Sequence, residues 1–310
     1  MFGRISKMLL LALLGLSATC ERPVDLPIDL PEPRLVVVSN FTLMRQLEVR
    51  VSRSQSILDA GVGEYLPDAR VELYSAGLLL EQLELVIPPG GRIPPYYTTR
   101  NVALREGVEY LIRVEVEGFE PVTAVSAIPP PVPISYFQVY NASLGPAQSP
   151  GAVLYDYSVR FNFQDPPNET NYYHLNFFQQ VKEYINIEGD TIILRELLYP
   201  LVFSSANDNN VINAYFSGGI LMQDNPFRTG LNFHTSFEVE PEFELLGKVF
   251  VELRTVSEDY YLFHSSLSRQ QEQPQGPLTE PVIVYDNVDN GHGIFAGYNT
   301  STDSVSVVIR

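Results

Sequence analysis

The chain has 310 residues, 45% of them hydrophobic, and its 37 acidic side chains against 20 basic ones give a formal net charge of −17. Such acidity makes nucleic acid and anionic lipid headgroups poor partners, and it is typical of an exported protein kept soluble by its charge. The single cysteine excludes a disulfide within one molecule, and the length exceeds the usual size of one domain.

The N-terminal residues have the layout of a secretory signal. Arg4 and Lys7 precede an apolar run at 8–16, which is followed by small or polar residues and then by Cys20. The run is too short for a membrane span, which needs about 20 apolar residues. We therefore predict that residues 1–19 form a signal peptide and are removed. Their removal would change the formal charge from −17 to about −19.

Cys20 is the predicted site of lipid attachment. Residues 16–20 resemble the lipobox of bacterial lipoproteins, in which the cysteine becomes the first mature residue and carries acyl chains such as palmitate. The match departs from the usual form at Ser17, where Leu is common, and at Thr19, where Gly or Ala is common. Each buried methylene would contribute about 0.8 kcal/mol to anchoring. The alternative is an ordinary signal cleaved near Ala18, which would leave a free thiol.

The proline-rich residues 20–33 predict a lipidated, extended tether that rises about 3.1 Å per residue. From 34 to 128 short runs alternate apolar and polar side chains, and turn-forming residues separate them. The apolar positions of these runs include Leu47, Val49, Val51, Val71, Leu73, Ile112, Val114 and Val116. This pattern predicts an immunoglobulin-like β-sandwich over 34–128.

Residues 129–133 form a proline-rich linker, because proline donates no hydrogen bond to a central strand. Residues 134–310 are predicted to form a second, β-rich domain. The alternating runs 157–163 and 173–177 flank a breaker segment and predict a hairpin. Further strands are predicted at 191–194, 211–216, 231–239, 248–254, 282–285 and 304–309.

One helix is predicted at 257–270. Ser257 can cap its N-terminus, the acidic residues that follow suit the helix dipole, and apolar residues recur at helical spacing. A polar loop is expected at 269–275. The predicted fold class is thus mainly β, an N-terminal immunoglobulin-like β-sandwich followed by a second β-rich domain with one short helix.

No motif in the sequence predicts a cofactor, a metal or a catalytic group. The histidines are His174, His234, His264 and His292, and their spacing favours structural roles over a metal pair, although distant strands could still bring them together. The oxygen-rich runs 207–210 and 286–291 are interpreted as turns rather than calcium loops. The glycine-rich run 291–298 is interpreted as tight backbone packing near the chain end, with a turn at 299–303 and the last strand after it.

Several segments together resemble a known family. They are the anchor at Cys20, the first sandwich, residues 161–166 running into 171–175, and the closing stretch from 281–282 to 291–297. The chain is similar to the Bacteroidetes lipoproteins classified as domain of unknown function 4249. The resemblance implies an outer-membrane or surface lipoprotein, often found in a genomic setting with TonB-dependent receptors. It supplies no catalytic residue.

The functional expectation is an exported, lipid-anchored lipoprotein of the outer membrane that acts as a non-enzymatic binding or accessory subunit. Its expected partners are the membrane, through the lipid, and an outer-membrane β-barrel transporter; nucleic acid is not expected, and the ligand is open. The cell surface is favoured over the periplasmic face, because Glu21, Asp25 and Asp29 make the segment after Cys20 acidic. The alternative is a surface hydrolase or glycan-active enzyme that uses two carboxylates.

Overall fold

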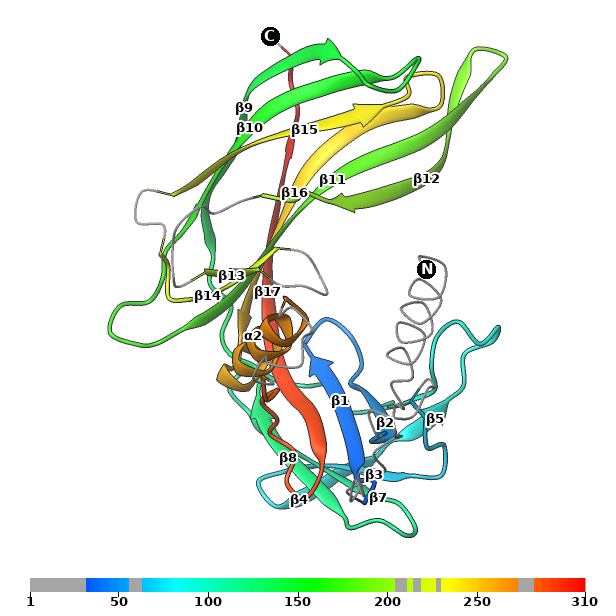
Figure 1. Ribbon diagram of the computed structural model, residues 1–310, viewed down its shortest axis with the longest axis vertical. Helices are drawn as coiled ribbons and strands as arrows, with labels where there is room; N and C mark the ends of the chain where they lie inside the picture. Colours follow the sequence, from blue (N-terminus) through cyan, green and yellow to red (C-terminus); the bar gives the residue numbers. More distant parts are fainter. Residues whose placement is uncertain are drawn as a thin grey trace, which may run out of the picture. The chain divides into compact units, whose positions relative to one another are not determined.

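The computed structural model describes residues 32–55, 63–203, 211–213, 219–226, 230–272 and 282–309. This part of the chain is mainly β, and within it α2 (Glu258–Glu272) is the one helix (Figure 1). The predicted fold class is confirmed at this level. The immunoglobulin-like identity of the first sandwich and the boundaries of the two domains stay predictions. The signal peptide, Cys20 and most of the tether lie outside the described residues.

The strands form three sheets. One has ten strands in the order β13-β14-β11-β16-β17-β1-β2-β6-β5, with β12 paired to β11; the others are β15-β10-β9 and β4-β3-β7-β8. The strands up to the proline-rich linker are β1 (Leu35–Phe41), β2 (Glu48–Arg53), β3 (Arg70–Ser75), β4 (Leu78–Gln82), β5 (Glu84–Val86), β6 (Tyr96–Thr98), β7 (Glu109–Glu115) and β8 (Val122–Ala127). The later ones are β9 (Ile134–Pro146), β10 (Val153–Phe163), β11 (Tyr172–Ile187), β12 (Asp190–Pro200), β13 (Val211–Asn213), β14 (Ile220–Gln223), β15 (Leu231–Val239), β16 (Glu244–Val256) and β17 (His292–Ser306).

The first hydrophobic core lies between β1, β2 and the sheet β3-β7-β8. Every apolar position of the predicted alternation in this region is buried, from Leu47 to Val116. The core also takes Val288 and Phe295 from the far end of the chain. Phe295 stacks on Phe41 with ring centroids 4.5 Å apart. The alternating pattern therefore identified the inward faces correctly, although the C-terminal contribution has no local signal in the sequence.

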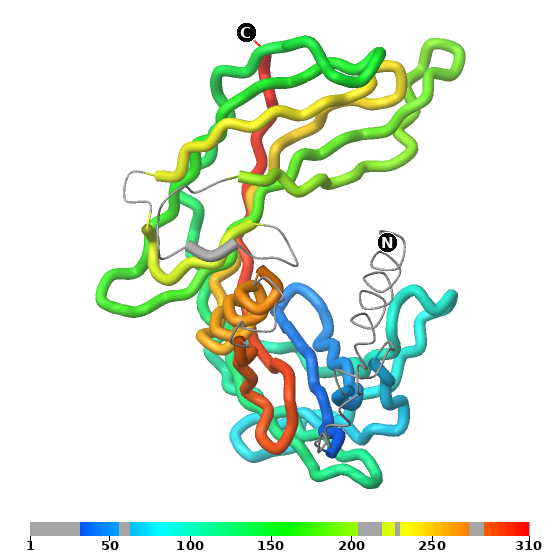
Figure 2. The backbone as a smooth tube through the Cα atoms, in the orientation of Figure 1, coloured from blue at the N-terminus to red at the C-terminus, as the bar shows by residue number. Residues whose placement is uncertain are grey.

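β17 brings that C-terminal contribution, because it pairs with β1 in parallel and with β16 in antiparallel register (Figure 2). The predicted tight backbone packing is confirmed: a Cβ atom on Gly293 would lie 2.0 Å from the carbonyl oxygen of Val37, and one on Gly297 would lie 2.2 Å from that of Ala127. The turn predicted at 299–303 is wrong, since these residues continue β17. Their polar side chains are tolerated because β16 pairs with their backbone.

The second core lies between the sheet β15-β10-β9 and the strands β11 and β16. The hairpin predicted from 157–163 and 173–177 is wrong, because β10 and β11 belong to different sheets and face each other. The rings of Phe161 and Phe177 meet edge to face at 5.5 Å, and the Tyr157 hydroxyl donates to Gln179 Oε1 at 2.7 Å. The prolines of the connecting segment have no N–H groups to extend a hairpin ladder, and crossing between sheets buries both aromatic faces.

The other predicted elements are mostly confirmed. Strands occupy the predicted positions 191–194, 231–239 and 248–254, whereas of 211–216 only the first three residues are described, as β13. Residues 304–306 belong to β17, but 307–309 lie beyond it. The strand predicted at 282–285 is wrong. There the backbone N–H of Tyr285 donates to the Ser266 hydroxyl of α2 at 2.9 Å, so it is not free to join a ladder.

α2 begins where the sequence predicts it to begin. The Ser257 hydroxyl accepts a hydrogen bond from the backbone N–H of Tyr260 at 3.3 Å, which is the expected cap. The helix continues to Glu272, so the loop predicted at 269–275 is wrong for 269–272, and the rest of that segment lies outside the described residues. In the part of the chain described here, no helix has the length and apolar character that a membrane crossing requires.

Candidate functional site

The strongest candidate site is a groove on the outer face of the sheet β4-β3-β7-β8. Strand pairing places side chains of this face in rows, because opposite residues of antiparallel strands point to the same side. One row is Tyr74, Leu111 and Val125, and the next contains Arg113 and Thr123. The inward residues of the same strands fill the first core, so the face is held on a rigid support.

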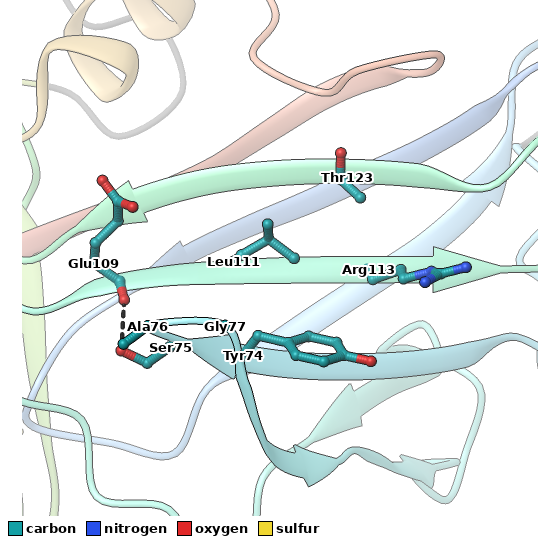
Figure 3. Close-up of a pocket in the computed structure, with 8 residues that line it drawn as sticks. All are labelled: Tyr74, Ser75, Ala76, Gly77, Glu109, Leu111, Arg113 and Thr123. Atoms are coloured by element: carbon teal, nitrogen blue, oxygen red, sulfur yellow. Dashed lines mark hydrogen bonds between the residues drawn. The ribbon is translucent and has the colours of Figure 1, made fainter.

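The groove encloses about 340 Å³. Figure 3 shows its wall and floor: Tyr74 and the β3–β4 turn lie along one side, and Leu111 lies between Glu109 and Arg113 on β7. The full lining is Tyr74, Ser75, Ala76, Gly77, Glu109, Leu111, Arg113 and Thr123. The site thus combines an apolar floor with hydrogen-bonding groups and both signs of charge, which suits an amphipathic ligand.

Most charges near the groove are already paired. The Tyr74 hydroxyl donates to Glu72 Oε2 at 2.7 Å, and Arg70 also binds this carboxylate. The hydrogen bond from Tyr74 is the largest cause that lowers the pKa of Glu72, while burial opposes it and Arg70 reinforces it. Arg113 pairs with Glu115 at 2.5 Å. These partners fix the side chains that border the cavity and limit their ability to rearrange.

Glu109 is different. Its side chain is exposed, and it forms no ion pair with any residue that the structure describes. Its backbone carbonyl accepts a hydrogen bond from the Ser75 hydroxyl at 2.8 Å, which ties the end of β3 to β7 (Figure 3). Among the described lining residues Glu109 is the one acid, so the groove offers a single carboxylate to a ligand. The paired carboxylates that glycoside hydrolysis requires are not brought together there.

The turn at the groove margin is conformationally demanding. Ser75 pairs with Leu78, so Ala76 and Gly77 form a two-residue loop, and both have positive φ, 48° and 75°. Such a turn matches the twist of a hairpin, but an alanine in the left-handed backbone conformation lowers the stability of the fold. Beyond the turn, Leu79 pairs with Tyr74 and is 52% exposed, so an apolar side chain of β4 continues the row of Tyr74 and Leu111.

A second feature is a buried polar cluster beneath α2, which we call the α2 cluster. Its centre is the Tyr260 hydroxyl, which lies 3.0 Å from Nδ1 of His174 on β11 and accepts a hydrogen bond from Arg254 of β16 at 3.3 Å. Arg254 also pairs with Glu252 at 2.7 Å and lies over the ring of Tyr298. These contacts join the helix to three strands of the large sheet.

His264 is the titratable group of this helix face. Burial, with a smaller contribution from the charge of Arg254, lowers its pKa to about 4. Its ring lies 4.2 Å from that of Tyr260, and Nε2 is 3.4 Å from Oδ1 of Asn40 on β1. The neutral ring therefore fits the docked helix, whereas a protonated ring would face the Arg254 guanidinium in a desolvated setting.

The structure does not bring the four histidines together, although two of them contact the same side chain, Tyr260. His174 and His264 belong to the α2 cluster, His234 pairs with Asp156 at 2.6 Å, and His292 lies 3.2 Å from Asp286. Within the described ranges no three His, Cys, Asp or Glu side chains gather as a metal site would require. In the run 286–291, Asn290 has a φ of 62°, as expected for turn chemistry. Cys20 and the run 207–210 lie outside the described residues.

Another hollow of about 510 Å³ lies between β9 and the end of β17, lined by Gln138, Val139, Tyr140, Asn141, Ala142, Val305, Ser306 and Val308. Its charge-free lining gives it less recognition chemistry than the groove. Sequence reasoning missed both hollows. The usable signal was the polar side of β7, where Leu111 interrupts an otherwise charged face between Glu109 and Arg113. An apolar residue on a solvent-facing row marks a place where something can bind.

The described part of the chain has a mainly β fold, and the groove is an amphipathic hollow on a sheet face. Residues 21–304 match the family model described as Domain of unknown function (DUF4249), so the chain belongs to this family. No curated protein matches the chain in sequence. The predicted membership of this family is thereby confirmed, whereas the Bacteroidetes origin and the lipid anchor stay predictions; the family's description assigns no activity.

Proposed function

We propose that this chain is an exported, lipid-anchored accessory protein of the outer membrane that binds an amphipathic ligand and works beside a β-barrel transporter. The observation that supports the binding role is the groove, whose apolar floor, Leu111, lies beside the exposed carboxylate of Glu109, which has no ion-pair partner among the described residues. A ligand with an apolar body and a cationic group fits this pair. The resemblance to Bacteroidetes lipoproteins, with their TonB-dependent neighbours, supports the location and the partner.

The groove can be tested with phenethylamine, which carries an aromatic ring and an ammonium group. We expect it to shift the amide resonances of Leu111 and Thr123. Glu109→Gln removes the carboxylate charge and Leu111→Glu makes the floor polar, so both variants should weaken the shifts. Ile283→Glu serves as the control, because Ile283 is 87% exposed and does not line the groove. Equal shifts in all variants would argue against the groove as a binding site.

The anchor is tested at Cys20. Cys20→Ser removes the thiol that would carry the lipid, and the acidic body should not be attracted to anionic membranes. We expect the variant to leave the membrane pellet or to retain its signal, and labelled palmitate to enter only the wild type. A wild type without label, and with a free thiol, would contradict the lipoprotein assignment.

The partner is tested by affinity capture from detergent-solubilised membranes. An accessory subunit should be recovered together with a β-barrel protein. Recovery of the chain alone in repeated captures would contradict the accessory role. Protease treatment of intact cells tests the face: the surface assignment predicts digestion of the body, whereas survival until the cells are broken would place it in the periplasm.

A further inference from the structure

The hairpin β11–β12 carries an apolar surface that the described part of the chain leaves exposed. Six of its aliphatic side chains are 39–57% exposed: Ile185, Ile187, Ile192, Ile193, Leu194 and Leu198. We call this set the hairpin surface. Burying such side chains elsewhere in the protein is the main source of stability, so exposed aliphatic residues gathered on one element indicate an interaction site.

The exposure involves both faces of the hairpin. Successive residues of a strand point to opposite sides, yet Ile192, Ile193 and Leu194 are all exposed. A bulge adds to this, because Glu183 pairs with Arg195 and Tyr184 pairs with Ile193, which leaves Leu194 as an extra residue on β12. A partner that covered one face alone would leave the other in water.

β12 is also a free edge. Among the described strands it pairs with β11 and with no other, so the backbone groups along its outer side meet no strand (Figure 1). Charged side chains often protect such edges, but here the two in the middle of β12 are tied to β11: Arg195 binds Glu183, and Lys182 binds Glu196 at 2.8 Å. The edge is therefore available for backbone pairing by another extended segment.

The negative charge at the turn between β11 and β12, which we call the tip, indicates what kind of partner can bind the edge. Glu188 and Asp190 are exposed at the turn, and neither forms an ion pair within the described part of the chain. An anionic lipid surface would be repelled by these carboxylates, and a second copy would bring the same carboxylates and a formal charge of −17. An extended segment that alternates apolar and basic residues satisfies the edge, the hairpin surface and the tip together.

We propose that the edge of β12 binds an extended, basic segment of a protein partner, which adds a strand to the sheet and covers the hairpin surface. The backbone of the added strand pairs with β12, its apolar side chains contact Ile193 and Leu198, and its basic side chains meet the tip carboxylates. This inference rests on the proposed accessory role and deepens it, since it names where the partner is held and by what chemistry.

The probe is a synthetic peptide of about ten residues that alternates valine and lysine, a length typical of a strand. Binding to the full chain is measured by fluorescence anisotropy, and the site by hydrogen exchange. We expect slower exchange along β12, and no binding by a valine–glutamate peptide of equal length. N-methylation of alternate peptide bonds on the pairing edge should abolish binding, because it removes the donors of the new ladder while retaining the side chains.

The double variant Leu194→Lys and Leu198→Lys adds like charge beside the peptide and should weaken binding about tenfold or more. Both side chains are more than half exposed, so the fold should persist. The double variant Met44→Lys and Ile283→Lys is the matched control, since it places the same two charges on more exposed residues outside the hairpin and should bind as the wild type does.

The proposal is overturned if exchange slows elsewhere than β12, if the N-methylated peptide binds equally well, or if the double variant binds as the control does. Concentration-dependent dimers whose contact protects β12 would identify a second copy as the occupant. Association with phosphatidylethanolamine–phosphatidylglycerol vesicles, lost in the double variant, would identify a lipid surface. Because the probe needs neither the lipid nor the transporter, peptide binding without a captured β-barrel would refute the accessory role and leave the strand-binding edge standing.

Discussion

The hairpins β3–β4 and β11–β12 are built on the same kind of turn but serve the molecule differently. Each has a two-residue loop with positive φ at both positions, Ala76–Gly77 in the first and Glu188–Gly189 in the second. In each hairpin the second strand, β4 or β12, carries exposed aliphatic side chains. The first hairpin stays on the sheet and borders the groove, whereas the second continues beyond the core and presents an open edge.

The difference originates in how far each long strand is buried. β3 is short, and its inward residue Leu73 lies wholly inside the first core. β11 is buried through Val181 and then becomes progressively exposed to Ile187. The residues of the turn therefore determine where the chain reverses direction. The burial of the strand before the turn determines whether the hairpin borders the groove, as β3–β4 does, or exposes a free edge, as β11–β12 does.

The largest expected effect on stability distinguishes the buried part of β11, which we call the root of the hairpin β11–β12, from its exposed tip. Phe177 contacts four other phenylalanine rings in the second core, so Phe177→Ala should destabilise the protein by about 3–5 kcal/mol. Ile187→Ala, on the exposed part of the same strand, should change stability by no more than about 0.5 kcal/mol. Urea unfolding of both variants is the measurement. Similar losses would mean that the tip is packed in solution.

Acidic pH should also destabilise the root of the hairpin and leave its tip unaffected. The pKa of His264 is lowered to about 4 in the folded protein, so between about pH 6.5 and pH 4 the unfolded chain binds more protons at this residue. The stability contributed by the neutral ring is fully present above pH 6.5 and falls as the pH decreases, by about 2 kcal/mol at pH 5. Urea unfolding between pH 7 and pH 5 measures this slope.

The variant that checks the assignment is His264→Gln, which cannot titrate and should flatten the slope. His234→Gln is the control, because His234 is 63% exposed and lies outside the α2 cluster. Hydrogen exchange at pH 5 should become faster in α2 and in β11 near His174, but not in β3 or β4. An unchanged slope in His264→Gln would assign the acid sensitivity to another group.

The sequence predicted those parts of the fold that have a local physical signal. The alternation around Val49 and Val114 identified inward faces, and Ser257 identified the start of α2. It could not predict that β10 and β11 face each other across a core, because a strand that crosses between sheets and one that returns beside its neighbour show the same alternation. Long-range pairing, such as that of β1 with β17, also has no local signature.

The candidate site was harder to predict than the fold. Cys20 stands in a motif, so the sequence predicts a role for it, and that role stays a prediction. The groove has no such motif, because it exists only where β3, β7 and β8 align Tyr74, Leu111 and Thr123. The hairpin surface was missed for a related reason. A run such as 192–194 is equally consistent with a buried strand, and only the folded chain shows that these side chains are exposed.

The smallest expected effect tests whether the two turns really differ only in their surroundings. A Cβ atom on Gly77 or Gly189 would meet nothing within 4 Å, so Gly77→Ala and Gly189→Ala should each cost about 1–2 kcal/mol through backbone strain alone. Ala76→Asn and Glu188→Asn should each recover a few tenths of a kcal/mol, because Asn tolerates positive φ better. Urea unfolding of the four variants measures these changes.

The two turns should then differ in their consequences for the groove. The Ser75 hydroxyl ties the first turn to the backbone carbonyl of Glu109, so strain introduced by Gly77→Ala should reach β7 and shift the amide resonance of Leu111. Strain introduced by Gly189→Ala should leave that resonance unchanged and be confined to the tip of β11–β12. Ser75→Ala supplies the control, since loss of the hydroxyl should shift Leu111 without altering the turn glycine. A shift of Leu111 in Gly189→Ala would show that the hairpins are coupled, and the contrast between a site-bordering turn and a free one would fail.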